Sequence, residues 1–236
     1  MSKIIRELEV VILCGGRGTR LAEETKVIPK PLVKIGNKAI ISHIMSHYKK
    51  YNLNNFILAT GYKGNIIKDK FKNNKNIRCH NTGLNTLTGG RIKRLKNIIK
   101  NDFFLMTYGD GLCSVNIKKL INFHKSHKKI ATITAVRPPA RFGRVILNNN
   151  IVTSFEEKNQ LNEGWINGGF FIFNREIFDY IENDRTSLEQ EPLEALSKAK
   201  ELIAFKHSGF WQCMDTIRDR DYLRELFREK KYVFKK

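Results

Sequence analysis

The feature that most constrains the fold is an alternation of short apolar runs with segments of helical periodicity through the first 140 residues. The apolar runs have the length of strands and lie at residues 10–13, 56–62, 76–80, 103–111 and 130–137. The helical patterns lie at residues 40–48, 64–71, 89–99 and 115–128. Strands that are apolar throughout and are joined by helices indicate a parallel sheet that is covered on both faces. We therefore expect an α/β protein with a Rossmann-like sheet flanked by helices.

The pattern changes after Pro138 and Pro139, where three asparagines predict a hairpin between strands at 144–148 and 151–158. The remaining predictions are strands at 164–173, 201–207 and 210–216 and helices at 175–182, 188–200 and 218–231. The sheet should thus be mixed and mostly parallel. Because no linker, repeat or low-complexity stretch divides the chain, we expect one domain over residues 1–236, preceded at its start by an extension of residues 1–9.

The charge of the chain is strongly positive, with a formal net charge of +20. Such a charge suits a polyanionic partner, and nucleic acid is the first candidate. The lysines, however, are spread over nearly every predicted helix and loop, and no basic block with interleaved aromatic residues is present. Charge alone gives only salt-sensitive, non-specific affinity. We therefore expect no nucleic-acid partner and assign the charge to the binding of small phosphates.

The location of the protein in the cell can be predicted from signals that the sequence lacks. No apolar run approaches the roughly 20 residues of a membrane span, and the first residues, MSKIIRELEV, lack the apolar stretch of a signal peptide. The four cysteines are scattered without a CxxC pair, which indicates reduced thiols and neither a disulfide framework nor a zinc site. We expect a cytoplasmic protein with no membrane partner.

A glycine-rich loop, GGRGTR at residues 15–20, follows the first predicted strand. Backbone N–H groups of such a loop can bind phosphate, although a simple tight turn explains it as well. It is neither a P-loop nor the GxGxxG fingerprint, whose third glycine is replaced by Leu21. Arg20 lies at its end, and Lys30 stands between two prolines that hold it on a stiff extended segment. Together, Arg20 and Lys30 suit a triphosphate.

Two carboxylates also follow predicted strands. Asp110 lies between glycines in YGDG, and Asp215 lies in MDT. Mg²⁺ commonly takes one or two protein carboxylates and completes its shell with water and phosphate oxygens. Each aspartate could instead cap a turn, so their pairing remains open at this point.

A third group of polar residues lies around the strand predicted at 164–173. Glu157 and Lys158 precede it, and Trp165, Asn167 and Gly168 begin it. A carboxylate, an amide and an indole N–H around a lysine suit a phosphorylated polyol, whose phosphate would bind the lysine. A polar hairpin with a core tryptophan is the alternative.

These motifs carry a family resemblance. GGRGTRL, PKP, YGDG, EK, WINGGFF and FWQCMDT occur in that order and resemble the sugar-1-phosphate nucleotidyltransferases from about Val10 to Tyr222. TGGR at 88–91 and RPPARFG at 137–143 make the chain most similar to the glucose-1-phosphate cytidylyltransferases among them. The resemblance implies a nucleotidyltransferase, or GT-A-like, fold and Mg²⁺-dependent transfer of CMP from CTP to a sugar 1-phosphate, most readily glucose 1-phosphate, within nucleotide-sugar and lipopolysaccharide O-antigen biosynthesis.

The resemblance also implies roles for particular residues. It divides the chain into a nucleotide-binding half at about 10–140 and a sugar-phosphate-binding half at about 141–236. The nucleotide set is Leu13, Gly15, Gly16, Gly18, Thr19, Arg20, Lys30, Thr88, Gly89, Gly90 and Asp110. The sugar-phosphate set is Glu157, Lys158, Asn167 and Gly168. Asp110 and Asp215 would hold the metal, and Arg20 and Lys30 would be catalytic.

The sequence departs from the family at three places. The segment between Phe71 and Thr82 is short, Asn159 replaces a proline, and Cys14 replaces an alanine. The short segment leaves the sugar open, and with it whether the protein is a homo-oligomer. A related nucleotidyltransferase with another nucleotide or acceptor therefore remains an alternative. So does a non-catalytic nucleotide- or nucleic-acid-binding protein, although such a protein would be expected to lose some of the four charged residues of the phosphate and metal sets.

Overall fold

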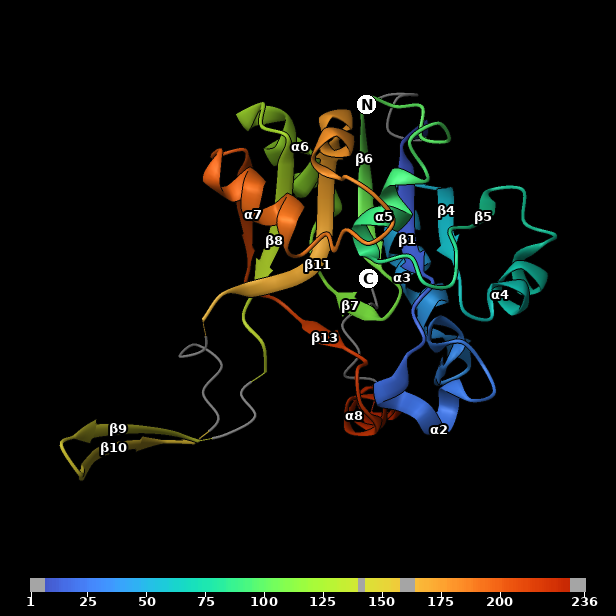
Figure 1. The fold of residues 1–236 in the computed structure, drawn as a ribbon. Coiled ribbons are helices and arrows are strands. Elements are labelled where there is room, and N and C mark those ends of the chain that lie inside the picture. The colour runs from blue at the N-terminus through green and yellow to red at the C-terminus, as the bar shows by residue number, and fades with distance from the viewer. Residues whose placement is uncertain (1–6, 140–142, 158–163, 230–236) are drawn as a thin grey trace.

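The centre of the molecule is a seven-stranded sheet with the strand order β12-β8-β11-β6-β1-β4-β5 (Figure 1). The structure is a computed structural model that describes residues 7–139, 143–157 and 164–229. The strands are β1 (Glu9–Cys14), β4 (Asn55–Thr60), β5 (Ile77–Asn81), β6 (Phe103–Tyr108), β8 (Ala131–Val136), β11 (Ile166–Asn174) and β12 (Leu202–His207). β11 is antiparallel to both of its neighbours, and all other neighbouring pairs are parallel. The predicted mixed, mostly parallel sheet is confirmed.

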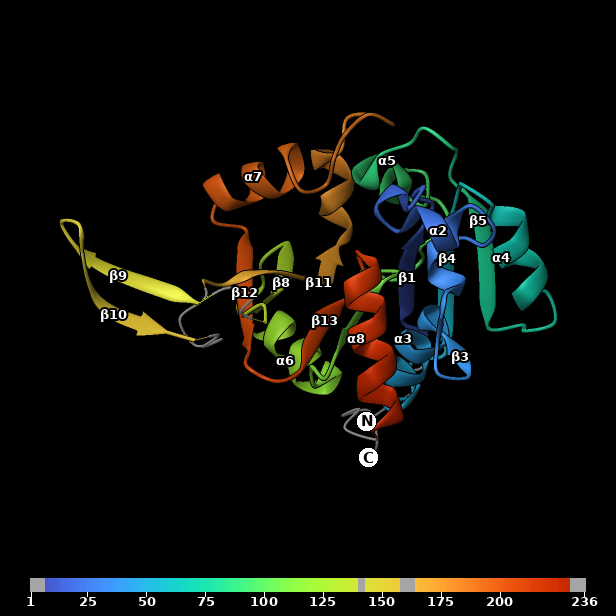
Figure 2. The ribbon, with the colours of Figure 1, turned by 90° about the horizontal axis from the view of Figure 1, so that it is seen from below.

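Helices cover both faces of the sheet (Figure 2). One face carries α3 (Ile40–Lys49), α4 (Gly64–Phe71), α6 (Ile117–His127) and α8 (Ile217–Arg228). The other carries α5 (Thr88–Lys93), the 3₁₀ helix η4 (Arg175–Tyr180) and α7 (Glu191–Lys198). Successive residues of a strand point to opposite faces, so Val10 and Ile12 enter one core and Val11 enters the other. This two-sided burial explains why β1 is apolar throughout.

Shorter elements lie at the carboxyl ends of the parallel strands. They are η1 (Thr19–Leu21), α2 (Ala22–Thr25), η2 (Lys30–Leu32), β2 (Lys34–Ile35), β3 (Lys38–Ala39), β7 (Gly111–Cys113) and β13 (Trp211–Cys213). β7 pairs with β13, and β2 pairs with β3. The predicted hairpin is present as β9 (Arg144–Asn148) and β10 (Ile151–Glu156), which pair with each other and, among the described residues, with no other strand. No helix in the described part of the chain is long and apolar enough to cross a membrane.

Some element boundaries differ from the predictions. The strand predicted at 103–111 is two strands, because a turn at Gly109 and Asp110 separates β6 from β7. The helix predicted at 89–99 is α-helical only to Lys93 and continues as turns, and the helix predicted at 175–182 is a 3₁₀ helix. The turn after β6 matters most, since it places a carboxylate at the edge of the sheet where ligands of such folds bind.

Candidate active site

The glycine loop leaves β1 at the carboxyl edge of the sheet. Gly18 has φ 64°, a left-handed conformation that favours glycine, and a Cβ there would lie 2.9 Å from Cγ2 of Thr25. The hydroxyl of Thr25 donates to the carbonyl of Gly18 at 3.0 Å. At Gly15 a Cβ would lie 2.0 Å from a guanidinium nitrogen of Arg91, whereas a Cβ at Gly16 would meet nothing within 4 Å. Gly15 and Gly18 are thus required by packing, and Gly16 borders open space.

Arg91 is buried behind this loop, with 4% of its surface exposed. Its guanidinium donates to the carbonyl of Gly15 at 3.0 Å, to the carbonyl of Gly83 at 2.8 Å and to the hydroxyl of Thr82 at 2.7 Å. It also reaches the carbonyl of Thr60 at 3.3 Å. Since these oxygens follow or end β1, β4 and β5, one side chain joins three loops at the sheet edge. Burial lowers the pKa of Arg91 from its ordinary value, and the group nevertheless stays charged at neutral pH.

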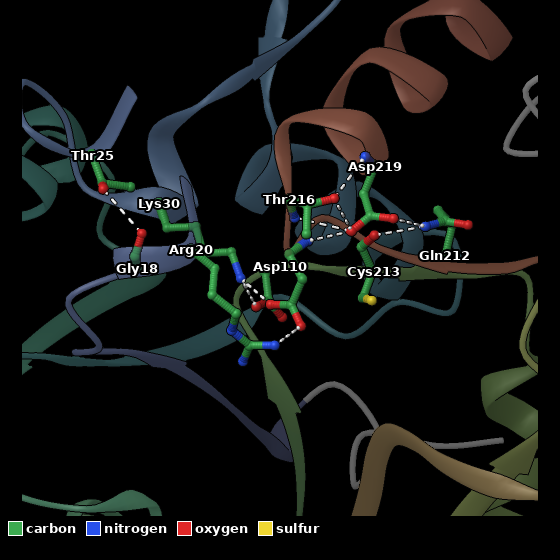
Figure 3. Close-up of polar contacts among 10 residues, drawn as sticks. Gly18, Arg20, Thr25, Lys30, Asp110, Gln212, Cys213, Thr216 and Asp219 are labelled. Carbon is green, nitrogen blue, oxygen red and sulfur yellow. Dashed lines mark hydrogen bonds and ion pairs between the residues drawn. The ribbon is translucent and has the colours of Figure 1, made fainter. Parts of the chain in front are cut away.

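Four charged side chains meet in front of the loop (Figure 3). The Lys30 ammonium lies 2.6 Å from Oδ2 of Asp110 and 2.6 Å from Oδ1 of Asp215. Arg20 donates to the other oxygen of Asp215 at 2.7 Å. The Arg20 side chain is 74% exposed, whereas that of Lys30 is only 12% exposed. Lys30 is therefore the enclosed cation of the cluster, and Arg20 is the one at the solvent side.

The ion pairs also determine the protonation of Lys30. Burial alone would lower its pKa, but the carboxylates of Asp110 and Asp215 outweigh burial, and the pKa lies above its ordinary value. Lys30 is therefore a full positive charge at neutral pH, as a group that binds phosphate must be.

The two aspartates meet because their flanking segments are hydrogen-bonded. β7 and β13 pair, and the N–H of Met214 donates to the carbonyl of Asp110 at 2.9 Å. Asp215 immediately precedes the N-cap of α8, where Thr216 and Asp219 form a capping box. The N–H of Asp215 itself donates to Asp219 at 3.2 Å. The strand pair and the helix start thus hold both carboxylates at one place.

This pair fits a divalent cation. Both carboxylates already bind one positive atom, the Lys30 nitrogen, so a single cation can reach both. In the described residues no cluster of three or more His, Cys, Asp or Glu side chains suits a metal. A cation here would therefore take two protein carboxylates and complete its shell from water and a ligand, which is how Mg²⁺ is usually held on phosphate substrates.

The charged cluster and the glycine loop form one wall of a cleft. A network of hydroxyl groups around Glu189 forms the opposite wall. Its carboxylate accepts hydrogen bonds from Thr88 at 2.6 Å, from Ser187 at 2.8 Å and from the hydroxyl of Tyr108. Burial, together with the charge of Glu189, raises the pKa of Tyr108, so its phenol remains a donor. Asn167 lies beyond Tyr108 and accepts from the N–H of Gly169 at 2.8 Å. The network thus connects the start of α5 to the end of β6 near β11.

These walls enclose a cleft of about 600 Å³ that collects most of the predicted site. The predicted residues that line it are Leu13, Gly15, Gly16, Gly18, Thr19, Arg20, Lys30, Thr88, Asp110, Asn167 and Asp215. Residues without an assigned role in the sequence also line it, namely Cys14, Pro31, Thr86, Leu87, Arg91, Tyr108, Gly109, Glu189, Trp211 and Cys213. A larger hollow over α8 and β2 contains none of the predicted residues, and we assign it no part in this chemistry.

Some predicted residues do not line the cleft. Gly89 and Gly90 lie in the first turn of α5, where a Cβ would meet backbone atoms of Thr186 and Asp184 at 2.8 and 2.6 Å. Gly168 accepts from the indole N–H of Trp211 at 2.7 Å. These three glycines therefore allow close packing behind the wall.

Two other sugar-phosphate candidates remain, Glu157 and Lys158, and the structure describes only the first of them. Glu157 is exposed at the end of β10 and does not line the cleft. Lys158 lies outside the described residues. In the structure, the assignment of this pair to the acceptor's phosphate and hydroxyls thus has no geometric support, and it stays a prediction of the resemblance.

The chain is similar to known enzymes over nearly its whole length. It is 44% identical to a glucose-1-phosphate cytidylyltransferase of Salmonella typhimurium, with 97% of this chain and 99% of the relative covered. It is 38% identical to a probable glucose-1-phosphate cytidylyltransferase of Bacillus subtilis with the same coverage. Among solved structures, HddC from Yersinia pseudotuberculosis complexed with GMP-PN superposes with a TM-score of 0.72 at 27% identity, covering 93% of this chain and 99% of that one. A family model described as nucleotidyl transferase matches residues 9–218, and the chain belongs to that family.

Proposed function

We propose that this protein transfers a cytidylyl group from CTP to glucose 1-phosphate, which gives CDP-glucose and pyrophosphate. The observation that carries the proposal is the cleft in which Arg20 and Lys30 face Asp110 and Asp215, in a chain 44% identical to a glucose-1-phosphate cytidylyltransferase. A phosphate oxygen of the sugar phosphate attacks the α-phosphorus of CTP. The bond from that phosphorus to the oxygen bridging to the β-phosphate breaks, and pyrophosphate leaves with the electron pair.

The chemistry needs positive charge and positioning more than acid–base groups. The attacking phosphate oxygen is already ionised at neutral pH, so no general base is required. Lys30 and Arg20 would exchange their aspartate partners for phosphate oxygens of CTP and neutralise the charge that develops at the α-phosphate. N–H groups of the loop from Gly15 to Thr19 would hold the same phosphates.

Asp110 and Asp215 would hold Mg²⁺ once Lys30 has turned to the phosphates. When bound, the ion would supply positive charge to the phosphate oxygens and fix their orientation. Two carboxylates without a third acidic ligand leave the remaining coordination positions for water and substrate oxygens, which supports this assignment.

Within a single domain, one half of the chain would bind CTP and the other half would bind the sugar phosphate. Residues at about 10–140 contribute the glycine loop, Lys30, Thr88 and Asp110 to CTP, with the packing glycines Gly89 and Gly90 behind. Residues at about 141–236 would contribute Asn167 to the sugar phosphate, with the packing glycine Gly168 behind it. The resemblance adds Glu157 and Lys158 to this half. The first half supplies most of the lining of the cleft, which supports its role in nucleotide binding. The protein would work in the cytoplasm.

A guanine nucleotide is the second candidate donor. One relative, 32% identical over 90% of this chain, is a mannose-1-phosphate guanyltransferase of Saccharomyces cerevisiae, and HddC was solved with GMP-PN. The higher identity to cytidylyltransferases favours CTP. A non-catalytic binding protein is less favoured still, because Arg20, Lys30, Asp110 and Asp215 are all present and adjacent.

The test is pyrophosphate release with Mg²⁺, with CTP, UTP, dTTP, GTP and ATP each offered to glucose 1-phosphate and to a blank acceptor. Release with CTP and glucose 1-phosphate alone supports the proposal. Release with GTP would instead support a guanine nucleotide, the second candidate, as the donor. Binding of CTP without release would mean that the short segment after Phe71 has changed the acceptor, and other sugar phosphates would then be offered.

A further inference from the structure

Two positive side chains share one tryptophan ring at the carboxyl edge of the sheet. The guanidinium carbon of Arg137 lies 4.9 Å from the ring centroid of Trp165, and the ammonium nitrogen of Lys206 lies 5.6 Å from the same centroid. Both distances are those of cation–π contacts. We call Arg137, Trp165 and Lys206 the cationic subsite, since the ring collects two like charges at one place.

The strand register places this subsite on the same face of the sheet as Asn167. Asn167 of β11 is paired with Ala135 of β8, and Ala135 is paired in turn with Lys206 of β12. Cross-strand partners point to the same side of a sheet, so Asn167 and Lys206 share a face. Asn167 lines the cleft. The cationic subsite therefore continues the cleft wall from β11 toward β12.

The Lys206 side chain is directed toward the cleft. In the sheet order β12-β8-β11, its ammonium reaches across β8 to the ring of Trp165, which directly precedes β11. Lys206 is exposed, and 37% of Trp165 is exposed as well. Lys206 forms no ion pair with a carboxylate of the described residues, and contact with a ring leaves N–H donors of an ammonium available. A ligand in the cleft can therefore reach this charge.

The proposed reaction joins two anions, and each of them needs positive charge in the cleft. Lys30 and Arg20 would serve the phosphates of CTP, and Arg91 is occupied by neutral oxygens behind the glycine loop. The wall on the other side of the cleft has a neutral side chain, Asn167, and the network around the carboxylate of Glu189. Such a wall offers no attraction to a phosphate. The acceptor's phosphate therefore needs cations beyond it.

We propose that Arg137 and Lys206 bind the phosphate group of the acceptor, and that Trp165 holds the two cations side by side for it. The inference rests on the proposed cytidylyl transfer, because it assigns residues to the acceptor of that reaction. Arginine binds phosphate through a planar fork of donors, and lysine binds it as a point charge.

The spacing of the strands is compatible with this role. Arg137 follows β8, Asp110 follows β6, and β11 lies between these two strands. Neighbouring strands lie about 4.8 Å apart, so the ends of β8 and β6 are separated by roughly 10 Å. A long cationic side chain and a phosphate group together can span that gap. The acceptor would then be held between the cationic subsite and the proposed metal ligands.

The cation–π contacts could also serve only to fasten the ends of β8 and β12 to β11. The chain offers a control for that structural role. The ammonium of Lys125 lies 5.3 Å from the ring centroid of Phe103, which begins β6 at the opposite edge of the sheet. Lys125→Met thus breaks the same kind of contact far from the cleft.

The test is titration calorimetry with glucose 1-phosphate. It is carried out with Mg²⁺ and a CTP analogue that has a methylene group in place of the α,β-bridging oxygen, so that no pyrophosphate is released. We expect Lys206→Met and Arg137→Gln each to raise Kd for glucose 1-phosphate by about tenfold or more, because a charge-assisted hydrogen bond is lost. Kd for the analogue should not change. Lys125→Met should change neither constant, and Lys206→Arg, which keeps the charge, should retain most of the affinity. Circular dichroism checks that each variant is folded.

Other outcomes overturn the proposal. They are an unchanged Kd for glucose 1-phosphate in Lys206→Met and Arg137→Gln, an equal loss in Lys125→Met, and a wild type that binds no glucose 1-phosphate. An equal loss with unphosphorylated glucose would show that the cations bind hydroxyl groups instead. A loss confined to glucose 6-phosphate would place the cations at the other end of the sugar.

Binding and turnover are measured separately. A protein that binds glucose 1-phosphate through Arg137 and Lys206 but releases no pyrophosphate from CTP would contradict only the proposed function. Transfer from CTP with an unchanged Kd for glucose 1-phosphate in Lys206→Met and Arg137→Gln would contradict only the cationic subsite.

Discussion

Lys30 and Asp110 form an ion pair of 2.6 Å although 80 positions separate them in the chain. The same ammonium holds Asp215, so the proposed phosphate-binding lysine lies between the proposed metal ligands. Substrate binding must break these pairs. The triphosphate can do so because it offers oxygens to Lys30 and Arg20 and thereby leaves both carboxylates for a cation. Metal and nucleotide should therefore bind together better than either binds alone.

Removal of the Lys30 charge tests this coupling. We expect Lys30→Gln to bind Mn²⁺, used as a probe for the divalent site, about tenfold more tightly without nucleotide, because a neighbouring positive charge is removed. The same variant should bind CTP more weakly. Electron paramagnetic resonance of free Mn²⁺ and titration calorimetry with CTP measure the two effects. Lys34→Gln, an exposed control, should change neither. Weaker Mn²⁺ binding by Lys30→Gln would contradict the coupling.

Asp110→Asn tests the carboxylate pair itself. The amide keeps the shape of the side chain but removes one charge, so kcat should fall by a factor on the order of 10²–10³, while the protein remains folded. Asp102→Asn at the other end of β6 is the control and should retain activity. Steady-state kinetics with Mg²⁺ and a thermal melt give both readouts. Near-normal turnover in Asp110→Asn would remove this residue from the metal site.

The alternation of apolar runs and helical patterns predicted the sheet correctly, because burial on both faces leaves a strong signal in each strand. The candidate carboxylates could also be found, since Asp110 and Asp215 follow apolar strands. Their pairing could not, because it depends on the β7–β13 ladder, which joins distant segments. Glu189 was missed for the same reason: its partners Thr88 and Tyr108 lie on other elements.

Arg91 belongs to the TGGR motif, but its role could not be predicted, because a buried arginine that bonds only neutral oxygens has no charged partner to look for in the sequence. The glycines offered an indirect signal. Gly15 and Gly61 both have the Arg91 guanidinium where a Cβ would be, at 2.0 and 2.6 Å. A glycine at the end of each of two predicted strands is visible in the sequence. This pattern could have suggested that a large side chain packs against both strand ends.

Gly15→Ala and Gly16→Ala test the close approach of the Arg91 guanidinium to the glycine loop, because each substitution adds only one methyl group. In Gly15→Ala the new methyl group overlaps Arg91, which must move and leave buried carbonyl groups without their donor. We expect a loss of about 2–4 kcal/mol of unfolding free energy. Gly16→Ala adds the same methyl group in open space and should change stability by less than about 1 kcal/mol. Urea unfolding of both variants measures the change in unfolding free energy. Equal losses in the two variants would show that the contact with Arg91 does not cause the destabilisation of Gly15→Ala.

Glu189→Gln tests the hydroxyl network on the opposite wall. An amide has one acceptor oxygen, so it cannot serve Thr88, Tyr108 and Ser187 as the carboxylate does. Because Glu189 positions Thr88, which is assigned to CTP, we expect KM for CTP to rise by about tenfold, with a smaller effect on kcat. Glu191→Gln, two positions along at the start of α7, is the matched control and should leave both constants unchanged. A normal KM in Glu189→Gln would limit this carboxylate to a structural role.

His47 predicts a dependence of stability on pH. It is 5% exposed, and its Nε2 donates to the carbonyl of Val115 at 2.8 Å. Burial lowers the pKa of His47 from 6.5 to about 4. Between these values the unfolded chain binds a proton that the folded chain does not, so stability must fall as the pH falls from 6.5 to 4. The two pKa values set an upper limit of about 3 kcal/mol on this loss.

His47→Gln isolates this contribution, because the amide can still donate to Val115 but does not titrate. The buried His43, whose pKa burial also lowers, will contribute in the same window, so only part of the slope should disappear. We expect the unfolding free energies of the two proteins to differ by a constant amount above pH 7 and to converge or cross as the pH falls toward 4. Urea unfolding in a pH series measures this. Parallel curves over the whole series would mean that His47 is protonated equally in the folded and unfolded chains.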